Sequence, residues 1–524
     1  MLWFFACARL SPEPVAPAAL LPLPSGPGAS TPALVEDGEA LLLTWQVKAE
    51  EGGALWFSRF DDEGWSAPVE LVSDPALLVN WADYPSAVRG GDGALYTHWL
   101  RREEGGPYAY DPVVLRSEDG LEWTELGTLN SDEEPAEHGF VSWVPSPSGA
   151  RATWLDGRGM AEGEPMSLRA AQVGTRIYDE VVVDDRVCDC CRTDAAGDLV
   201  VYRDRSPTEI RDISVARPGE EGWATAPLSV DRWQIAGCPV NGPDVEVDGQ
   251  RAVTAWFTAA DEPARVRVAF AEDGWGFGEA VDVAPGPDEP APLGRVALEP
   301  EGEGAVVIWL ASIGEDNAAV SGRRVTLDGA VGPTVEIGFT AASRKAGFPS
   351  LARHGEDLLV AWTVPGQGLE ARRLSVADFP PAVAPLQLGG AGGGPPPTLP
   401  ALELTTLEGE ALSVPQGGVL IALWATWCGP CREELPQLQA LHDAGVPVLG
   451  ISVDDPDRTE AVAAYVEELG LSFPVAHAFE LAERFGTNAI PATYVYDAEG
   501  ALLWHRIEAF DPEDPALLQA LSEL

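Results

Sequence analysis

Lysine is almost absent from this chain of 524 residues, in which Lys48 and Lys345 are the only two. Lysine and arginine together number 33, against 83 aspartate and glutamate residues, so the formal net charge is −50. Because such a charge repels nucleic acid phosphates, we expect no nucleic acid partner. The acidic residues are dispersed in short groups, which indicates either an ordinary solvated surface or adaptation to high salt.

Long hydrophobic runs are also missing, since no stretch approaches the roughly 18 apolar residues that cross a bilayer. The N-terminal MLWFFAC nevertheless places a bulky apolar run before Cys7, and a segment rich in proline and alanine follows. Residues 1–28 resemble the end of a bacterial lipoprotein signal and its tether, although the basic region is missing and the apolar run is short. The resemblance implies a protein on the periplasmic side of the cell envelope, which contacts the membrane only through a lipid on Cys7; the alternative is an unmodified Cys7.

A repeat runs through the first two thirds of the chain. Short apolar runs that end in an aromatic residue recur roughly 50 residues apart. They end at Trp45, Trp99, Trp154, Tyr202, Trp256, Trp309 and Trp362. Strands and turns at this spacing are typical of four-stranded blades, so we predict an all-β propeller over residues 29–382. We count seven repeats, with six blades as the alternative, and expect the N-terminal segment to complete the last blade.

The turn RSEDGLEW resembles the Asp box of sialidase-like (BNR-type) propellers, with Ser117, Asp119, Gly120 and Trp123 in place. Asp boxes stabilise blade turns away from the catalytic centre, so the resemblance concerns the fold alone. Glycosidase chemistry of the sialidase kind would need three clustered arginines, a tyrosine nucleophile and an acidic partner. It is the third of the functions considered.

The glycine- and proline-rich residues 383–399 predict an interdomain linker. Strands and helices then alternate over residues 400–524, which predicts an α/β domain with a largely parallel sheet. The chain is therefore expected to be multidomain, with a propeller followed by an α/β fold.

The stretch WATWCGPCREELP resembles the active site of the thioredoxin superfamily, in particular of the TlpA/ResA-like exported thiol-disulfide oxidoreductases. Cys428 and Cys431 form its Cys-Gly-Pro-Cys motif, and Ile490-Pro491 matches the loop whose proline is cis in the family. A strand-to-helix junction at Cys428 would favour a thiolate there. We therefore expect Cys428 to attack a substrate disulfide and Cys431 to resolve the mixed disulfide. The pair needs no cofactor.

Further residues around the motif have expected roles. Glu434 follows Cys431 on the same helical face and either exchanges a proton with it or is a plain surface residue. Pro491 and Ile490 would present backbone groups to an extended substrate. Trp424 and Trp427 are expected to pack around the site, and Trp427 is the candidate side chain for substrate contact.

Four other cysteines await an explanation: Cys188, Cys190 and Cys191 in VCDCC, and Cys238 about one blade downstream. The repeat places both stretches in first strands of consecutive blades, so that they can meet at one rim. The cluster is a structural disulfide, a copper or zinc site, or a redox client of the thioredoxin domain. The C-x-C-C pattern resembles one found in sialidase-like bacterial proteins, and that resemblance implies no function.

These observations predict an exported thiol-disulfide oxidoreductase that reduces protein disulfides with electrons from a membrane donor, while the propeller recognises a substrate or partner. The Gly-Pro between the active-site cysteines is that of thioredoxin, which favours the reducing direction. The alternative is a metal- or ligand-binding propeller whose cysteine cluster the thioredoxin domain keeps reduced.

Overall fold

The computed structural model describes residues 20–524 apart from 220–221, 261–262, 287–288, 315, 381–397, 400–401, 403, 408, 410, 413, 415–417, 427, 455–457, 479–484, 486–489, 508–509, 511 and 513. The chain divides into two compact units, Met1–Ala382 and Val383–Leu524. Among the described residues no helix has the length and apolar character that crossing a membrane requires. Cys7, the predicted lipidation site, lies outside the described residues.

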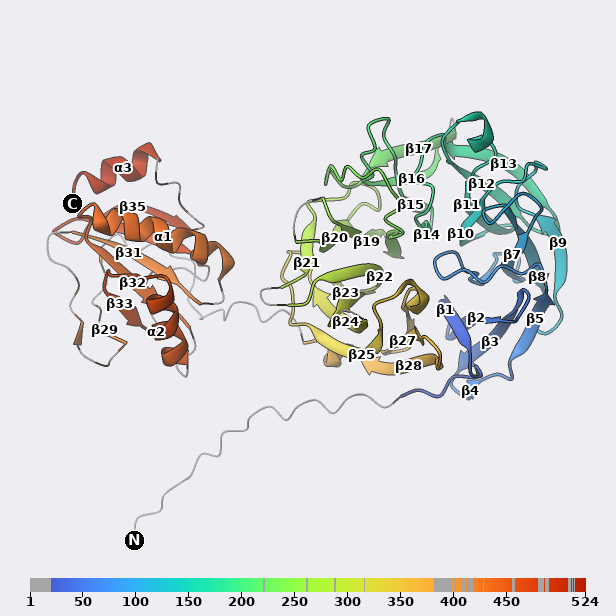
Figure 1. The fold of residues 1–524 in the computed structure, drawn as a ribbon, viewed down its shortest axis with the longest axis horizontal. Helices are drawn as coiled ribbons and strands as arrows, with labels where there is room; N and C mark the ends of the chain where they lie inside the picture. Colours follow the sequence, from blue (N-terminus) through green and yellow to red (C-terminus); the bar gives the residue numbers. More distant parts are fainter. Residues whose placement is uncertain are drawn as a thin grey trace, which may run out of the picture. The chain divides into compact units, whose positions relative to one another are not determined.

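The first unit is a ring of seven antiparallel sheets (Figure 1), so seven blades, and not six, are present. The first three blades comprise β1 (Ala29–Asp37), β2 (Ala40–Lys48), β3 (Gly53–Asp61), β4 (Gly64–Trp65) and β5 (Val69–Asp74); β6 (Val88–Arg89), β7 (Leu95–Arg102), β8 (Tyr110–Ser117) and β9 (Thr124–Thr128); and β10 (His138–Ser146), β11 (Gly149–Asp156), β12 (Ser167–Val173) and β13 (Ile177–Asp184).

The other four blades comprise β14 (Asp194–Ala196), β15 (Leu199–Arg203), β16 (Ile213–Gly219) and β17 (Gly222–Pro227); β18 (Asp244–Asp248), β19 (Arg251–Thr258), β20 (Arg265–Ala271) and β21 (Val281–Ala284); β22 (Pro292–Glu301), β23 (Gly304–Ser312), β24 (Asn317–Val325) and β25 (Val335–Ala341); and β26 (Ser350–His354), β27 (Asp357–Val364) and β28 (Gly368–Ser375).

Each of the seven repeated apolar runs forms the second strand of its blade, as the sequence predicts. Their aromatic residues are buried, from Trp45 in β2 to Trp362 in β27. Strands buried on both faces read as continuous apolar runs, and a large ring at the same position in every repeat fills the space between neighbouring blades. Burial of such side chains supplies the main driving force for assembling the ring.

The ring is closed by the N-terminal segment. Leu20 forms an antiparallel bridge with Arg372 of β28, and the Leu21 amide donates a 2.8 Å hydrogen bond to the Ala371 carbonyl. Leu21 and Leu23 also pack against the apolar cluster between the first and last blades. The expected closure by the N-terminal segment is confirmed. The propeller therefore includes Leu20, and the boundary predicted at residue 29 is too late.

Neighbouring blades are joined by a device that recurs in three first strands. A non-glycine residue there has a positive φ of 54–58° at a register shift, which turns its amide away from its own sheet. The amide donates a hydrogen bond to a side chain of an adjacent blade or of the segment leading into the preceding blade. The pairs are Thr31 with Thr363, Phe140 with Asp83, and Arg295 with Asn241. Each bond compensates for a backbone conformation that L-residues rarely adopt.

The turn between β8 and β9 has the hydrogen bonding expected of the Asp-box pattern. The Asp119 carboxylate accepts bonds from two following backbone amides at 2.8 and 3.0 Å, and the Ser117 hydroxyl accepts one from the Gly120 amide at 2.8 Å. The Trp123 indole returns a bond to the Gly120 carbonyl. Gly120 has a φ of +77°, which a glycine adopts without strain. The turn is a local structural device.

The described residues of the second unit include a five-stranded sheet in the order β33-β32-β31-β34-β35 and three α-helices (Figure 1). Its elements are β29 (Leu404–Thr405), β30 (Ala411–Leu412), β31 (Val419–Trp424), α1 (Gly429–Asp443), β32 (Val448–Ser452), α2 (Thr459–Glu468), β33 (Val475–His477), β34 (Ala492–Tyr496), β35 (Leu502–Ile507) and α3 (Pro515–Leu521).

The expected order of strands and helices is confirmed, but the largely parallel sheet is not. Strands β31, β32 and β33 run parallel, whereas β34 pairs antiparallel with both β31 and β35. The hairpin from β34 to β35 accounts for one antiparallel pairing, since consecutive strands joined by a short turn must reverse. The domain also begins earlier than residue 400, because Thr398 pairs with Ala501 and the Leu399 amide bonds to the Gly500 carbonyl.

Candidate active site

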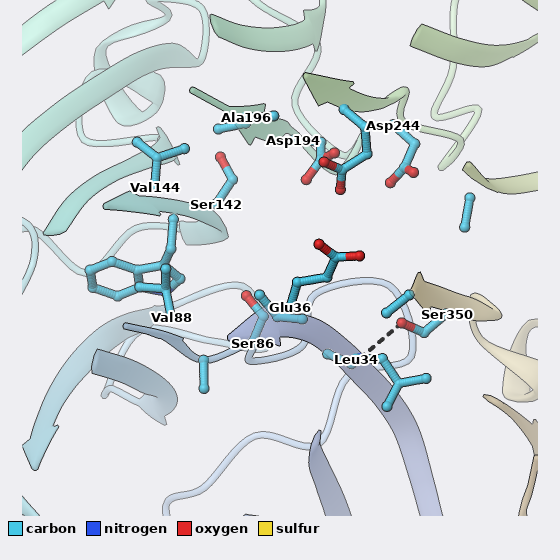
Figure 2. A pocket seen from close by; sticks show the side chains of 18 of the residues that line it. Leu34, Glu36, Ser86, Val88, Ser142, Val144, Asp194, Ala196, Asp244 and Ser350 are labelled. Atoms are coloured by element: carbon cyan, nitrogen blue, oxygen red, sulfur yellow. Dashed lines mark hydrogen bonds between the residues drawn. The ribbon is translucent and has the colours of Figure 1, made fainter. Parts of the chain in front are cut away.

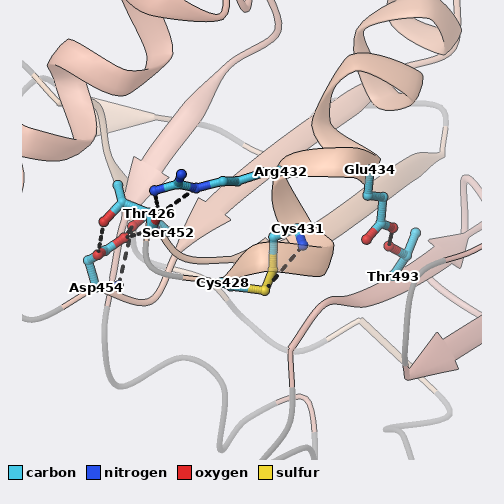
Figure 3. Close-up of a disulfide and its surroundings, with 8 residues drawn as sticks. All are labelled: Thr426, Cys428, Cys431, Arg432, Glu434, Ser452, Asp454 and Thr493. Atoms are coloured by element: carbon cyan, nitrogen blue, oxygen red, sulfur yellow. Dashed lines mark hydrogen bonds between the residues drawn. A yellow bond between two sulfur atoms is a disulfide. The ribbon is translucent and has the colours of Figure 1, made fainter. Parts of the chain in front are cut away.

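Cys428 lies where strand β31 gives way to helix α1, as the N-cap residue of that helix. Its sulfur accepts a hydrogen bond from the Cys431 amide at 3.2 Å and is bonded to the Cys431 sulfur (Figure 3). The free amides and dipole of a helix N-terminus stabilise an anion at this position, so the reduced Cys428 is placed to be a thiolate. Both cysteines are buried, Cys428 with 5% and Cys431 with 1% of its surface exposed.

Glu434 is buried, one helical turn beyond Cys431. Only 2% of its surface is exposed, and its carboxylate accepts a 2.7 Å hydrogen bond from the Thr493 hydroxyl on β34 (Figure 3). Burial raises the pKa of Glu434 to about 7, and the hydrogen bond from Thr493 opposes part of that rise. The interpretation of Glu434 as a plain surface residue is therefore wrong. A carboxyl that titrates near neutrality beside a dithiol is suited to proton exchange.

The loop before Cys428 is fixed by a buried carboxylate. Asp454, which follows strand β32, accepts hydrogen bonds from the Thr426 amide at 2.8 Å, from the Thr426 hydroxyl at 2.6 Å and from the Ser452 hydroxyl at 2.8 Å. The Arg432 guanidinium donates to the Thr426 carbonyl (Figure 3). It also lies over the Tyr465 ring. Thr426 is thus held on both sides, which positions the residues that lead into the active-site helix.

The Ile490–Pro491 peptide bond is cis, as the resemblance implied. Pro491 is buried and directly precedes β34, the strand that carries Thr493, while Ile490 is half-buried and packs against the domain core. Trp424 is buried in β31, in agreement with its expected packing role. Trp427, the candidate for substrate contact, lies outside the described residues.

In the propeller, the four remaining cysteines converge as free thiols. The Cys188 sulfur lies 3.3 Å from that of Cys191 and 4.0 Å from that of Cys190. The Cys190 sulfur also lies within 4.8 Å of the Cys238 sulfur and an Asp189 carboxylate oxygen. The meeting of the two stretches at one rim is confirmed.

The two cysteine stretches occupy loops, however, and not the first strands in which the repeat placed them. They lead into β14 and β18, which begin only at Asp194 and Asp244. The reason is that pairing with β15 is interrupted: Asp194 pairs with Val201 and Val187 with Asp204, while the residues between Cys188 and Asp194 loop out of the sheet. Cys188 and Cys191 are buried, Cys190 is half-buried and Cys238 is exposed, so the thiol cluster is reached from the Cys238 side.

Cys188 lies in a positive surrounding. The Arg211 guanidinium donates to its sulfur at 3.2 Å and to the Asp189 carboxylate at 2.9 Å. Hydrogen bonds with Cys190 and Cys191 and the charges of Arg203 and Arg211 hold the pKa of the Cys188 thiol well below its ordinary value. These neighbours favour a negative charge on the Cys188 sulfur.

A cavity of about 610 Å³ lies on the propeller axis and is lined by first strands of all seven blades and by the segments that flank them. Carboxylates of Glu36 on β1, Asp194 on β14 and Asp244 on β18 point into it (Figure 2), and Glu246 and Glu299 belong to the same lining. Burial is the main cause that raises the pKa values of all five carboxyl groups. The cavity is therefore acidic and binds protons more readily than free carboxyl groups do.

The arginines that line the described part of this cavity are Arg89 and Arg192. Arg203 is buried and donates to backbone carbonyls of Asn241, Arg211 and Phe257, which makes it a structural residue. No cluster of three arginines is thus present in the described lining, and the glycosidase hypothesis gains nothing from this geometry.

Sequence reasoning singled out Cys428, Cys431, Glu434 and the Ile490–Pro491 loop as candidates, and the structure joins the two cysteines in a disulfide at the start of α1. It missed Asp454, Thr426 and Thr493, which are separated from the motif in sequence or have no signal of their own. The Asp454 carboxylate could have been suspected because it stands just after a buried strand, where charged residues are rare without a partner. The acidic lining of the propeller cavity was missed as well.

Comparison with known proteins supports this description of the second unit. Residues 397–505 match the AhpC/TSA family. The thiol-disulfide oxidoreductase ResA of Bacillus anthracis is 29% identical over 113 residues, which are 20% of this chain and 64% of that protein. The sporulation thiol-disulfide oxidoreductase A of Bacillus subtilis is 29% identical over 116 residues, which are 20% of this chain and 70% of that protein.

Among solved structures, StoA of Bacillus subtilis is 27% identical, covers 24% of this chain and 100% of its own, and has a TM-score of 0.22. The segment that matches ResA covers less than two thirds of the ResA protein. These matches lie in the second unit of this chain. The strand order, the position of Cys428 and Cys431 and the sequence matches together make the C-terminal unit a thioredoxin-fold domain similar to the thiol-disulfide oxidoreductase ResA.

Proposed function

We propose that this protein is an exported thiol-disulfide oxidoreductase that reduces disulfides of other proteins. The observation that carries the proposal is the placement of Cys428 at the N-terminus of α1, bonded to Cys431, with the buried Glu434 carboxyl one turn further on. The similarity to proteins named thiol-disulfide oxidoreductases supports the same activity. No cofactor is required beyond the two cysteines.

In the first step the Cys428 thiolate attacks one sulfur of a substrate disulfide. The substrate S–S bond breaks, a bond forms between Cys428 and the attacked sulfur, and the other substrate sulfur leaves as a thiolate that takes a proton from water. The helix N-terminus stabilises the attacking thiolate. An extended substrate segment would lie against the Ile490–Pro491 loop, with backbone groups of that loop as hydrogen-bonding partners and Trp427 as a further contact.

In the second step the Cys431 sulfur attacks Cys428. The Cys431 thiol gives its proton to the Glu434 carboxylate, the mixed disulfide breaks, and the second substrate cysteine leaves reduced. Two electrons have then passed to the substrate, and Cys428–Cys431 is a disulfide, the state found in the structure. A membrane electron donor of the thiol-reducing type would restore the dithiol by the reverse exchange.

The propeller would select the substrate or partner. Its axial cavity of about 610 Å³ is of a size that ligand sites have, and its acidic lining favours a positively charged group. Export with a lipid on Cys7 would keep the protein on the periplasmic side of the cell envelope and near its electron donor.

A trapping experiment tests the activity. The Cys431→Ser protein, expressed in an exporting host, should keep Cys428 joined to whatever it attacks, and mass spectrometry of the unreduced protein should identify that partner. The Cys428→Ser protein is the matched control and should trap nothing. A Cys431→Ser protein that forms no mixed disulfide, although its Cys428 thiol reacts with an alkylating reagent, would refute the proposal. A bond to a propeller cysteine would identify an intramolecular client.

A further inference from the structure

We propose that Cys188, Cys190 and Cys191 bind a single soft d¹⁰ metal ion, Cu(I) or Zn²⁺, on the propeller rim, with Cys238 as the adjacent fourth thiol. This site is independent of the thiol-disulfide activity proposed above. Its thiols belong to the propeller and are separate from the Cys428–Cys431 disulfide.

The sulfur geometry is the first argument. The Cys188 sulfur lies 3.3 Å from that of Cys191 and 4.0 Å from that of Cys190, and all three lie within 4.8 Å of one another. Thiolates that share a tetrahedral ion with metal–sulfur bonds of about 2.3 Å are about 3.8 Å apart, so these separations suit a common ion. The sulfurs need only small side-chain shifts to surround it.

The backbone holds the three thiols in place before any ion binds. The Cys188 amide is bonded to the Arg203 carbonyl on one side of the loop. On the other side the loop that carries Cys238 packs directly on the Arg192 backbone at Gly242, where an added Cβ atom would lie 2.0 Å from the Arg192 carbonyl oxygen. The tight Asn-Gly-Pro segment after Cys238 therefore keeps the two cysteine loops in register. A site prepared in this way loses little conformational entropy on binding.

Positive side chains also lie next to the sulfurs. Three thiolates around Cu(I) carry a net charge of −2, and Arg211 and Arg203 are the neighbouring positive groups, of which Arg211 also pairs with the Asp189 and Glu209 carboxylates. Arg211 donates to the Cys188 sulfur, and the buried Arg203 has its three guanidinium nitrogens bound to backbone carbonyls close by. Cys188 and Cys191 are buried, whereas Cys190 is half-buried and Cys238 is exposed, so an ion can enter from the Cys238 side.

The chemistry of the sulfur ligands restricts which metal ions the site can bind. Thiolates select Cu(I) and Zn²⁺ over the hard cations that prefer oxygen. Three thiolates complete the coordination of Cu(I), and the three close sulfurs provide them. Zn²⁺ takes four ligands and would need Cys238 as well. The Cys238 sulfur lies near Cys190 and Asp189 and not within 4.8 Å of all three other sulfurs. This arrangement points first to Cu(I).

The test uses the full chain with Cys7, Cys428 and Cys431 changed to serine, which leaves only the four propeller cysteines. The reduced protein is titrated anaerobically with Cu(I) against bathocuproine disulfonate, and separately with Zn²⁺ against a chromogenic chelator. We expect one equivalent of Cu(I) per chain to be retained, with sulfur ligands in the metal-edge X-ray absorption spectrum. Adding Cys190→Ser should weaken retention at least tenfold, and because Cys190 is half-buried this change should leave the near-ultraviolet circular dichroism unaltered.

The Cys238→Ser change separates the two ions. Retention of copper in this variant assigns Cu(I) to the three-thiolate site, whereas retention of zinc that is lost in this variant assigns Zn²⁺ to a four-thiolate site. The proposal is overturned if the reduced protein retains neither ion against the competitors, or if Cys190→Ser retains either ion as well as the four-cysteine chain. A disulfide among these cysteines in protein isolated anaerobically from its exporting host would also overturn it.

Discussion

The Thr493 hydroxyl donates a 2.7 Å hydrogen bond to the Glu434 carboxylate, which joins strand β34 to helix α1. The bond lies between the helix that carries Cys431 and the strand that follows the cis Ile490–Pro491 bond. It fixes the orientation of a buried carboxyl group whose pKa lies near 7, so the group that we propose as proton acceptor of the resolving step has a defined place.

Replacement of this carboxyl group should slow resolution of the mixed disulfide. Glu434→Gln keeps the size and the hydrogen bond from Thr493 but cannot accept a proton, so the rate of substrate release should fall by roughly 100-fold. The wild-type rate should rise with pH around the Glu434 pKa of about 7, and this rise should be absent in the variant. Stopped-flow kinetics with a model disulfide peptide measures both effects. Glu468→Gln, on an exposed face of α2, is the matched control, and an unchanged profile in Glu434→Gln would remove Glu434 from the mechanism.

Loss of the Thr493 hydroxyl should move the same profile to higher pH. The hydrogen bond from Thr493 lowers the pKa of Glu434, so Thr493→Val should let that pKa rise. A hydrogen bond to a charged group contributes about 1.5 kcal/mol, which corresponds to about one pH unit. The same kinetic assay gives the midpoint. A midpoint that stays in place or moves to lower pH would contradict the role assigned to this hydrogen bond.

Glu434 should also make stability depend on pH. Its pKa is raised from 4.5 to about 7 in the folded domain, so the fold favours the protonated form. Below pH 4.5 the Glu434 carboxyl is neutral in both the folded and the unfolded chain and does not lower the free energy of unfolding. Between about pH 4.5 and 7 the free energy of unfolding falls as the pH rises. Glu434→Gln should therefore match wild type at low pH and exceed it above neutrality by on the order of 3 kcal/mol. Calorimetry across this pH range measures the difference in stability between the variant and the wild type. A difference that is the same at all pH values would contradict the raised pKa of Glu434.

Asp454→Ala should destabilise the loop that leads to Cys428. The change leaves the Thr426 amide, the Thr426 hydroxyl and the Ser452 hydroxyl without their buried acceptor. The cost should be about 3 kcal/mol, because unsatisfied buried polar groups each cost about 1–3 kcal/mol. Urea unfolding and the alkylation rate of reduced Cys428 report stability and loop position. Asp443→Ala, at an exposed carboxylate, should change stability by less than about 0.5 kcal/mol, and an equally small effect of Asp454→Ala would show that the loop is held otherwise.

Removal of the N-terminal closing segment should weaken the propeller. A chain that starts at residue 24 loses Leu20, Leu21 and Leu23, and with them the bridge to β28 and their packing between the end blades. Burial of leucine side chains contributes about 2 kcal/mol each at full burial, so a loss of about 2–4 kcal/mol is expected. Thermal unfolding followed by tryptophan fluorescence measures it. A chain that starts at residue 16 retains these leucines and is the control; equal midpoints for the two chains would contradict closure.

The sequence was informative where a physical pattern repeats or where a motif is local. Buried second strands read as apolar runs ending in Trp or Tyr, and seven such runs predicted seven blades with six as the alternative; the structure has seven. The Cys428–Cys431 pair and Glu434 lie within one helix, where spacing alone decides which residues share a face. These features needed no knowledge of distant contacts.

The remaining features depend on contacts between distant parts of the chain. Thr426 and Asp454 follow two different strands and are hydrogen-bonded to each other, but the sequence around either residue does not indicate its partner. Glu36, Asp194 and Asp244 line one cavity only because the first strands of three separate blades surround the same axis. The antiparallel direction of β34 against β31 follows from how the chain returns to the sheet, which alternation of strands and helices does not specify.

The bridge between Leu20 and Arg372 has a consequence for synthesis of the protein. The earliest described segment of the propeller to leave the ribosome pairs with one of its last strands, β28, so the ring stays open until nearly the whole propeller has been translated. Apolar blade edges near Leu21 remain uncovered during that interval, and a long-range contact of this kind forms slowly. The ring can therefore be completed only after β28 has been synthesised.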